Sequence, residues 1–248
     1  MPRRYWVPLL LEEPPLAHHL HAALTGWFDD SRYNPTGIDH NDGNKPYTIS
    51  PVTESDGVPG VLITTLDERA DRVMEWISRD RPAPRLGRQG EVLVGAPEVV
   101  AERSWGQIAR ATAPRSGTWE LLFHTPTFFR AGQDVNLLPL PGLVLKGAMD
   151  VMKEHVPQAI PDRSLRAFQQ LNLVHIDLTT ERYPFRSHTY TGFVGRIRYA
   201  CGNRQVADLV APLFEALPFV GVGSYRARGL GVVDVAPARE SSLPTQVA

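Results

Sequence analysis

Strand-like and helix-like stretches follow one another along this chain in an order that occurs twice. The first half predicts strand, helix, strand, strand, helix, strand, from apolar runs in the strands and from apolar residues every three or four positions in the helices. These stretches are residues 4–11, 16–28, 45–52, 59–66, a helix after Asp67, and 91–101. Asp67 is suited to cap a helix, and the Pro-, Asn-, Asp- and Gly-rich residues 29–44 predict a loop.

The second half repeats this order. Pro141-Gly142 is suited to open its first helix, and Asn203 precedes its second. The stretches are residues 118–123, 143–152, 171–178, 188–199, 206–217 and 231–235. Two such units predict an α+β fold of two tandem ferredoxin-like, RRM-like domains. We place these domains at residues 1–112 and 113–238 and expect a disordered tail at 239–248.

Composition restricts the class of protein. Of the 248 residues, 42% are hydrophobic and 21% are charged, which is typical of a globular chain with a buried core. No apolar run reaches the roughly 18 residues that a membrane-spanning helix needs. Glu12 and Glu13 stand where a signal peptide would have small residues, and the single cysteine, Cys201, excludes an intramolecular disulfide. We therefore expect a cytoplasmic protein with no membrane partner.

Charge is distributed unevenly, although the net charge is only −1. Residues 1–56 carry four basic and eight acidic side chains, a net of −4, whereas residues 181–231 carry seven basic and three acidic ones, a net of +4. A basic region can bind phosphates even in a chain of neutral total charge. The alternative is that these arginines only solvate the face of a sheet.

A glycine-rich stretch near the C-terminus is the sharpest candidate for a binding site. It has the pattern G-x-G-x5-G-x-G, formed by Gly221, Gly223, Gly229 and Gly231. Glycines let a backbone turn its amides towards a phosphate, and Arg226 and Arg228 inside the stretch add cationic donors. A dinucleotide site needs a strand before the glycines and a helix after them, and the order predicted here is the reverse. A plain glycine-rich hairpin remains the alternative.

A second candidate site lies at the end of the polar loop. His40 precedes Lys45 by five residues, and Lys45 opens a predicted strand. Histidine exchanges a proton near neutral pH, and a lysine ammonium stabilises negative charge that develops at a phosphate. A solvated loop histidine has the same local pattern, so both interpretations stay open.

The first predicted helix carries a third candidate, the histidines His18, His19 and His21. Positions 18 and 21 share one helix face, whereas position 19 points elsewhere. Zinc sites favour histidines four residues apart and need further ligands, so we predict no metal and no other cofactor. One of these histidines remains an alternative base or an RNA contact.

The predicted strand at residues 191–199 alternates apolar and basic side chains. This pattern buries one face of the strand and places Arg196 and Arg198 on the other. Such a face suits RNA lying across a sheet, and it equally suits an ordinary solvated surface.

Four motifs occur together in the second half. They are His124-Thr-Pro-Thr-Phe, Leu-Pro-Leu-Pro at 138–141, Gly-Phe-Val-Gly at 192–195, and the glycine-rich stretch at 221–231. In combination they resemble the CRISPR-associated endoribonucleases that cut precursor CRISPR RNA within its repeats, the sixth numbered Cas family of the RAMP superfamily. The resemblance extends from the first helix to residue 235.

The resemblance implies tandem ferredoxin-like domains and metal-independent cleavage of repeat RNA. In that chemistry a 2′-hydroxyl attacks the adjacent phosphate and leaves a 2′,3′-cyclic phosphate and a 5′-hydroxyl. The family pairs a histidine after the first helix with a lysine at the next strand, which His40 and Lys45 match, often with a tyrosine on the helix. Here the tyrosine's place falls near Thr25. This departure keeps His18, His19 and His21 open as alternatives.

Two further functions remain open at this point. One is a non-catalytic subunit that binds repeat RNA within a CRISPR effector complex. The other is a small-molecule enzyme, which would need a pocket of convergent polar groups that the sequence does not indicate. Either a monomer or a homodimer is compatible with the sequence.

Overall fold

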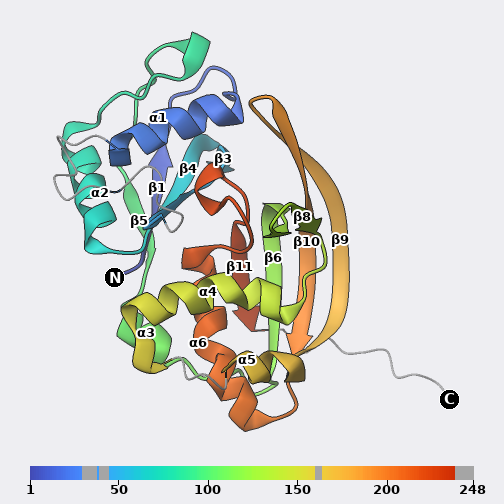
Figure 1. Ribbon diagram of the computed structural model, residues 1–248. Helices are drawn as coiled ribbons and strands as arrows, with labels where there is room; N and C mark the ends of the chain where they lie inside the picture. Colours follow the sequence, from blue (N-terminus) through green and yellow to red (C-terminus); the bar gives the residue numbers. More distant parts are fainter. Residues whose placement is uncertain (30–37, 39–44, 160–163, 238–248) are drawn as a thin grey trace.

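The N-terminal half forms an antiparallel sheet with the strand order β2-β4-β1-β5, and the short β3 pairs with β4. Its elements are β1 (Arg3–Pro8), α1 (Ala17–Asp29), β2 (Tyr47–Ile49), β3 (Thr53–Ser55), β4 (Val58–Thr65), α2 (Glu68–Asp80) and β5 (Glu98–Glu102). The computed structural model describes residues 1–29, 38, 45–159 and 164–237 (Figure 1). Most of the predicted loop 29–44, including His40, and the predicted tail 239–248 lie outside the described residues.

The C-terminal half repeats the arrangement with the strand order β11-β6-β10-β9, again antiparallel. Its main elements are β6 (Thr118–Thr127), α4 (Pro141–His155), β9 (Asn172–Phe185), β10 (His188–Ala200), α6 (Arg204–Val220) and β11 (Val233–Pro237). In both halves the first and third main strands are central and the second and fourth lie outside. This order is that of a ferredoxin-like sheet, so the predicted α+β fold with two tandem units is confirmed.

The predicted helix starts are confirmed at the atomic level. The Asp67 carboxylate accepts a hydrogen bond from the amide of Ala70 at 3.0 Å and caps α2. The Asn203 side chain accepts from the first amides of α6, and Pro141 is the first residue of α4. Capping depends on a few neighbouring residues, which explains why the sequence predicts it well.

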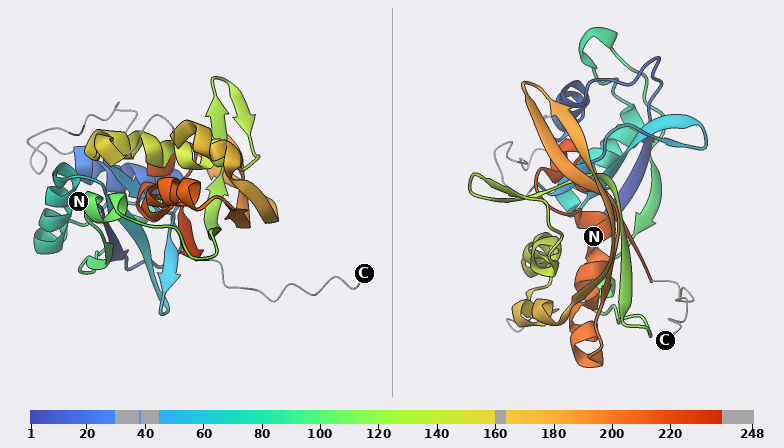
Figure 2. Two further views of the ribbon diagram at one scale, coloured as in Figure 1. Left: turned by 90° about the horizontal axis from the view of Figure 1, so that it is seen from below. Right: turned by 90° about the vertical axis from the view of Figure 1, so that its right-hand side faces the viewer.

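Several short elements were not predicted. They are β3, α3 (Trp105–Ala109), β7 (Phe129–Ala131), β8 (Asp134–Asn136) and α5 (Ser164–Ala167). Figure 2 shows the β7–β8 hairpin projecting from the second half. Trp105 and Ile108 of α3 are buried in the core of the second half, although both precede the predicted domain boundary after residue 112. The boundary itself stays a prediction.

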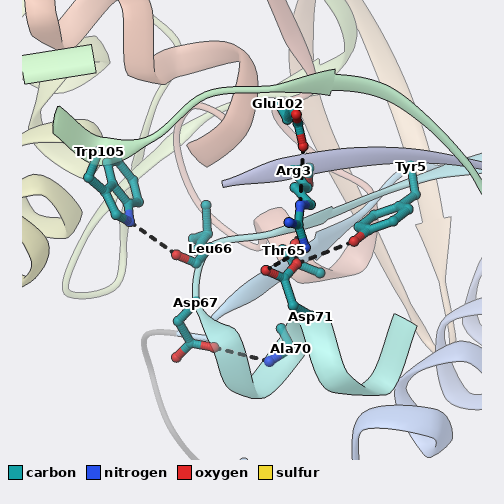
Figure 3. Close-up of polar contacts among 9 residues, drawn as sticks. All are labelled: Arg3, Tyr5, Thr65, Leu66, Asp67, Ala70, Asp71, Glu102 and Trp105. Atoms are coloured by element: carbon teal, nitrogen blue, oxygen red, sulfur yellow. Dashed lines mark hydrogen bonds and ion pairs between the residues drawn. The ribbon is translucent and has the colours of Figure 1, made fainter. Parts of the chain in front are cut away.

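A buried carboxylate ties α2 to the sheet of the first half (Figure 3). Asp71, only 6% exposed, accepts hydrogen bonds from Thr65 Oγ1 at 2.5 Å, Arg3 Nη1 at 3.3 Å and Tyr5 Oη at 3.4 Å. Burial and the nearby negative charge of Asp71 raise the pKa of Tyr5 to about 12, so its hydroxyl remains a donor at neutral pH. Several donors compensate the burial of the charge.

The two halves are joined by polar contacts that cross from sheet to sheet. Arg4 Nη1 on β1 pairs with Asp234 Oδ1 on β11 at 2.7 Å and links the two sheets, while His124 Nε2 on β6 lies 2.8 Å from Asp234 Oδ2 within the second sheet. Near α3, Trp105 Nε1 donates to Leu66 O at 3.1 Å (Figure 3). In the part of the chain that the structure describes, no helix has the length and apolar character to cross a membrane.

Candidate functional site

A cavity of about 480 Å³ lies where the two halves meet. The first half contributes α1 and the start of β2, and the second half contributes the turn between α6 and β11, which lies near α1 in Figure 1. The lining residues are His21, Thr25, Lys45, Tyr47, Thr48, Leu66, Arg130, Gly223, Ser224, Tyr225, Arg226, Ala227 and Arg228. The cavity therefore joins three features of the sequence: the helix with the histidines, Lys45 and the glycine-rich loop.

The shape of the glycine-rich loop requires glycine at specific positions. Gly223 has φ +78°, and a Cβ there would lie 2.4 Å from Phe128 O; Gly231 has φ +72°, and its Cβ would lie 1.8 Å from Val222 O. The amide of Val222 donates to Gly231 O at 2.9 Å and closes the loop. Between these points the chain forms a short 3₁₀ turn at Arg226–Arg228, so the loop is not a plain hairpin.

Some backbone amides of this loop donate no hydrogen bond to the described part of the protein. Those of Val222, Ser224 and Gly231 donate to backbone carbonyls. Those of Gly223 and Ala227 have no hydrogen-bond partner among the described residues, and both residues line the cavity. Such amides can donate to an anion.

Arg228 is held at the wall of the cavity by aromatic side chains. Its Nη1 donates to Tyr190 Oη at 3.1 Å, and its guanidinium carbon lies 4.3 Å from the ring centroid of Tyr225 and 5.3 Å from that of Phe185. A guanidinium has five N–H donors, so this arrangement orients the cation and leaves donors for a phosphate.

Arg226 has a different environment. Its Nη1 donates to Val220 O at 3.1 Å, at the C-terminal end of α6, where the helix dipole favours a cation. Burial lowers the pKa of Arg226 despite the opposing effect of Asp150 and Glu154 on α4. We interpret Arg226 chiefly as a brace that attaches the loop to the helices, although the sequence suggested a phosphate contact for both loop arginines.

His18 and His21 share a helix face as their spacing predicted, but the ring of His19 still lies 4.2 Å from that of His18. The rings of His18 and His21 lie 6.3 Å and 5.5 Å from that of Phe185, whereas His19 packs against Gly87. His21 Nδ1 lies 2.9 Å from Ala227 O. A carbonyl can only accept, so this contact places a proton on Nδ1 and orients the ring.

The remaining residues of the predicted catalytic set are only partly described. Lys45 lines the same cavity as His21, whereas His40 lies outside the described residues. At the place of the family's tyrosine, the hydroxyl of Thr25 donates to His21 O at 2.7 Å. Tyr47 lines the cavity as well, but its ring is buried against Phe28 at 3.9 Å.

A second cavity, of about 460 Å³, adjoins the first and shares His21, Thr25 and Arg228 with it. It extends to the tip of the β9–β10 hairpin. The cationic residues that line the two cavities are Lys45, Arg130, Arg186, Arg226 and Arg228. Asp29 is the one carboxylate among the described lining residues. This excess of positive charge suits a polyanion.

Arg196 and Arg198 lie on the outer face of the second sheet, as their alternation predicted. Arg196 Nε lies 3.5 Å from Glu120 Oε1 on β6, and Arg198 Nη2 lies 2.8 Å from Glu120 Oε2. The hydrogen bond from Arg198 lowers the pKa of Glu120, and the nearby charge of Arg196 acts in the same direction. Neither arginine lines the cavity of His21 and Lys45, so the structure does not bring them together with the rest of the candidate site.

Other predicted motifs lie elsewhere. His124 lines a different cavity, of about 550 Å³, between the halves, where Asp234 is its partner. Within residues 1–29, 38, 45–159 and 164–237, no group of three or more His, Cys, Asp and Glu side chains is placed to hold a metal ion.

Arg130, Tyr225 and the tyrosines of the β9–β10 hairpin were missed by the sequence analysis. Tyr225 lies inside the glycine-rich loop, and its position between glycines was an available signal. Arg130 belongs to the unpredicted β7 strand, and its guanidinium donates to the Tyr225 hydroxyl.

A family model matches part of the second half of the chain. Residues 121–233 match the family model described as CRISPR-associated endoribonuclease Cas6. No curated protein sequence matches this chain significantly.

Solved structures match nearly the whole chain. A Cas6 of Thermus thermophilus is 21% identical with a TM-score of 0.73, and the alignment covers 95% of this chain and 98% of that one. A Cas6 product complex is 20% identical with a TM-score of 0.79, covering 95% of this chain and 100% of that one. The product of a Cas6-related gene from Pyrococcus furiosus is 13% identical with a TM-score of 0.61, and the alignment covers 96% of this chain and 100% of that one. The family resemblance predicted from the motifs is confirmed.

Proposed function

We propose that this Cas6-like chain is an endoribonuclease that cuts precursor CRISPR RNA within its repeats, at the cavity between its two halves. The observation that carries the proposal is the convergence of an imidazole, an ammonium and unbonded loop amides on that cavity. Two of the similar structures are a product complex and a substrate-mimic complex of Cas6 proteins, which supports a bound substrate on this fold.

The proposed reaction is a transesterification within the RNA. The 2′-oxygen attacks the adjacent phosphorus, a base takes its proton, and the bond from phosphorus to the 5′-oxygen breaks as that oxygen receives a proton. The products are a 2′,3′-cyclic phosphate and a 5′-hydroxyl. Lys45 is suited to stabilise the charge that develops on the phosphate, and the amides of Gly223 and Ala227 to bind its oxygens. These steps are complete without a metal ion.

The proton transfer has two candidate residues. The resemblance assigns it to His40, which we keep as the first choice. His21 is the alternative, because its contact with Ala227 O orients its ring and because it lines the cavity with Lys45. Burial, His19 and Arg186 lower the pKa of His18, which favours its neutral form, but His18 does not line this cavity.

The test is cleavage of labelled repeat RNA in EDTA by the wild type, His40→Ala and His21→Ala, with analysis of the product ends. We expect a cyclic phosphate from the wild type and a rate lower by about 10²- to 10⁴-fold in the variant that lacks the base. Dependence on an added divalent metal, or ends other than a cyclic phosphate, would contradict the mechanism.

One observation favours a second function, a non-catalytic subunit that binds repeat RNA. At the place of the family's tyrosine stands Thr25, and its hydroxyl is bonded to the backbone of its own helix. A non-catalytic protein would bind the repeat tightly in the same assay and leave it uncut.

A further inference from the structure

The β9–β10 hairpin reaches across the second half to the glycine-rich loop. Tyr183 and Tyr190 are directly paired residues on its two strands, so their side chains lie on the same face of the hairpin. Tyr183 Oη donates to the backbone carbonyl of Arg228 at 2.8 Å, and Arg228 Nη1 donates to Tyr190 Oη at 3.1 Å. One cross-strand pair therefore holds both the main chain and the side chain of a single loop residue.

Aromatic packing reinforces these two hydrogen bonds. The ring of Tyr190 lies 5.0 Å from that of Tyr225, and the ring of Phe185 lies next to both Arg228 and His21. Burial raises the pKa of Tyr183 to about 12, so its hydroxyl stays a donor throughout the neutral range. The hairpin thus contacts the loop and the helix of His21 at once.

The loop depends on such external contacts. Its glycines give the backbone more conformational freedom than other residues would. Ordering the loop into a single shape therefore costs more conformational entropy, which the contacts must offset. Tyr225 has φ +61°, a conformation that is uncommon for a residue other than glycine and needs support from its surroundings. The carbonyl that orients His21 belongs to Ala227, directly before Arg228.

We infer that Tyr183 and Tyr190 are positioning residues for cleavage: together they fix Arg228 and the Ala227 carbonyl, and through them the guanidinium and the His21 imidazole that face the substrate. This inference rests on the proposed function, and neither tyrosine needs to touch the RNA. Removing a hydroxyl leaves the ring in place but frees the loop.

The experiment compares Tyr183→Phe and Tyr190→Phe with a matched control. Tyr199→Phe also removes a buried hydroxyl that donates to a backbone carbonyl, that of Pro139, and it lies outside the cavity. For each protein we would measure hydrogen exchange of the amides at 221–231, single-turnover cleavage of repeat RNA at saturating enzyme, and the Kd for that RNA.

We expect faster exchange in the loop and roughly tenfold slower cleavage for both hairpin variants, because small misplacements of reacting groups are costly. The change in Kd should be smaller than the change in rate. Tyr199→Phe should lower thermal stability but leave loop exchange and the cleavage rate unaltered. In an Arg228→Ala background, Tyr190→Phe should add nothing to the rate defect, since it acts through Arg228.

Two results would overturn the inference: unaltered loop exchange in both hairpin variants, or an undiminished cleavage rate once the loop is loosened. If the wild type itself fails to cut any repeat RNA, the proposed function fails. In that case, hydrogen exchange of the loop amides and the Kd for RNA in the hairpin variants still test the positioning role, because an Arg228 side chain that is held in place should bind RNA more tightly than a mobile one.

Discussion

Arg226 and Arg228 are two residues apart in sequence, but they have different environments. Arg228 lies between aromatic rings at the wall of the cavity and bonds Tyr190. Arg226 extends to Val220 O at the end of α6, where burial lowers its pKa. Both are arginines in one glycine-rich stretch of the sequence, so only the fold distinguishes the arginine held between aromatic rings from the one that bonds the end of α6.

This difference gives a prediction for the two single variants. Arg228→Ala should weaken binding of repeat RNA and reduce the slope of log Kd against log salt by about 1, because one phosphate contact is lost. Arg226→Ala should lower the melting temperature and leave that slope nearly unaltered. Titrations at several salt concentrations measure both, and an equal loss of slope in the two variants would assign Arg226 to the RNA as well.

At the scale of elements, α2 is positioned by polar groups at its first turns. Asp67 caps its N-terminus, and Asp71 one turn later binds β1 and β4 through Arg3, Tyr5 and Thr65 (Figure 3). The opposite end of the helix carries exposed charges such as Asp80. The polar anchor fixes how α2 packs on the sheet that also positions β2 and the adjoining Lys45.

Replacing Asp71 with alanine should therefore destabilise the protein. The variant leaves buried donors without an acceptor, and we expect the free energy of unfolding to fall by about 2 to 3 kcal/mol. Asp80→Ala is the matched control on the same helix and should change stability by less than about 0.5 kcal/mol. Urea unfolding followed by circular dichroism measures both, and equal midpoints for the two variants would contradict the role of Asp71.

At the scale of the whole molecule, the site exists only when the two halves are docked. Lys45 and His21 come from the first half, and the glycine-rich loop comes from the second. Arg4 and Asp234 join the two sheets away from that cavity, and His124 bonds Asp234 within the second sheet. The hydrogen bond from His124, together with Arg4, holds the pKa of Asp234 far below its usual range.

The sign of the resulting pH dependence follows from that lowered pKa. An ionised Asp234 stabilises the folded state fully above the unfolded-state pKa of about 3.9, and this contribution is lost as the pH falls further towards the folded-state pKa. Asp234→Asn should therefore lower the melting temperature at pH 7, and the difference from the wild type should shrink below about pH 4. A difference that stays constant from pH 7 to pH 2 would contradict the ion pair.

Much of this molecule could be predicted from local sequence, and the rest depends on pairing between distant segments. Asp67, Asn203 and Pro141 mark helix starts because caps act over a few residues. The second hairpin was predicted only as 171–178 and 188–199, whereas β9 continues to Phe185. Its last residues are mostly exposed and lack an apolar alternation, so their pairing with β10 holds them as a strand.

The residues of the candidate site likewise divide into those that local sequence predicts and those that depend on distant contacts. The glycines, Lys45 and His21 were recognisable by residue type and spacing. The contact between Tyr183, Tyr190 and Arg228 was not, because it needs the register of the hairpin and the docking of the loop. The sequence did contain one signal for this contact. A hairpin turn at Arg186 and Ser187 places Tyr183 and Tyr190 opposite each other on the two strands.

The most direct test of the central claim, that RNA is cut in the cavity between the halves, is the single-turnover cleavage rate of Lys45→Ala. Lys146→Ala is its matched control, since Lys146 is an exposed lysine on α4 that pairs with Asp150 outside the cavity. We predict that Lys45→Ala cleaves repeat RNA about 10²-fold more slowly, because charge at the phosphate is no longer stabilised, while Lys146→Ala retains the wild-type rate. Cleavage at the wild-type rate by Lys45→Ala would place the chemistry elsewhere and contradict the account.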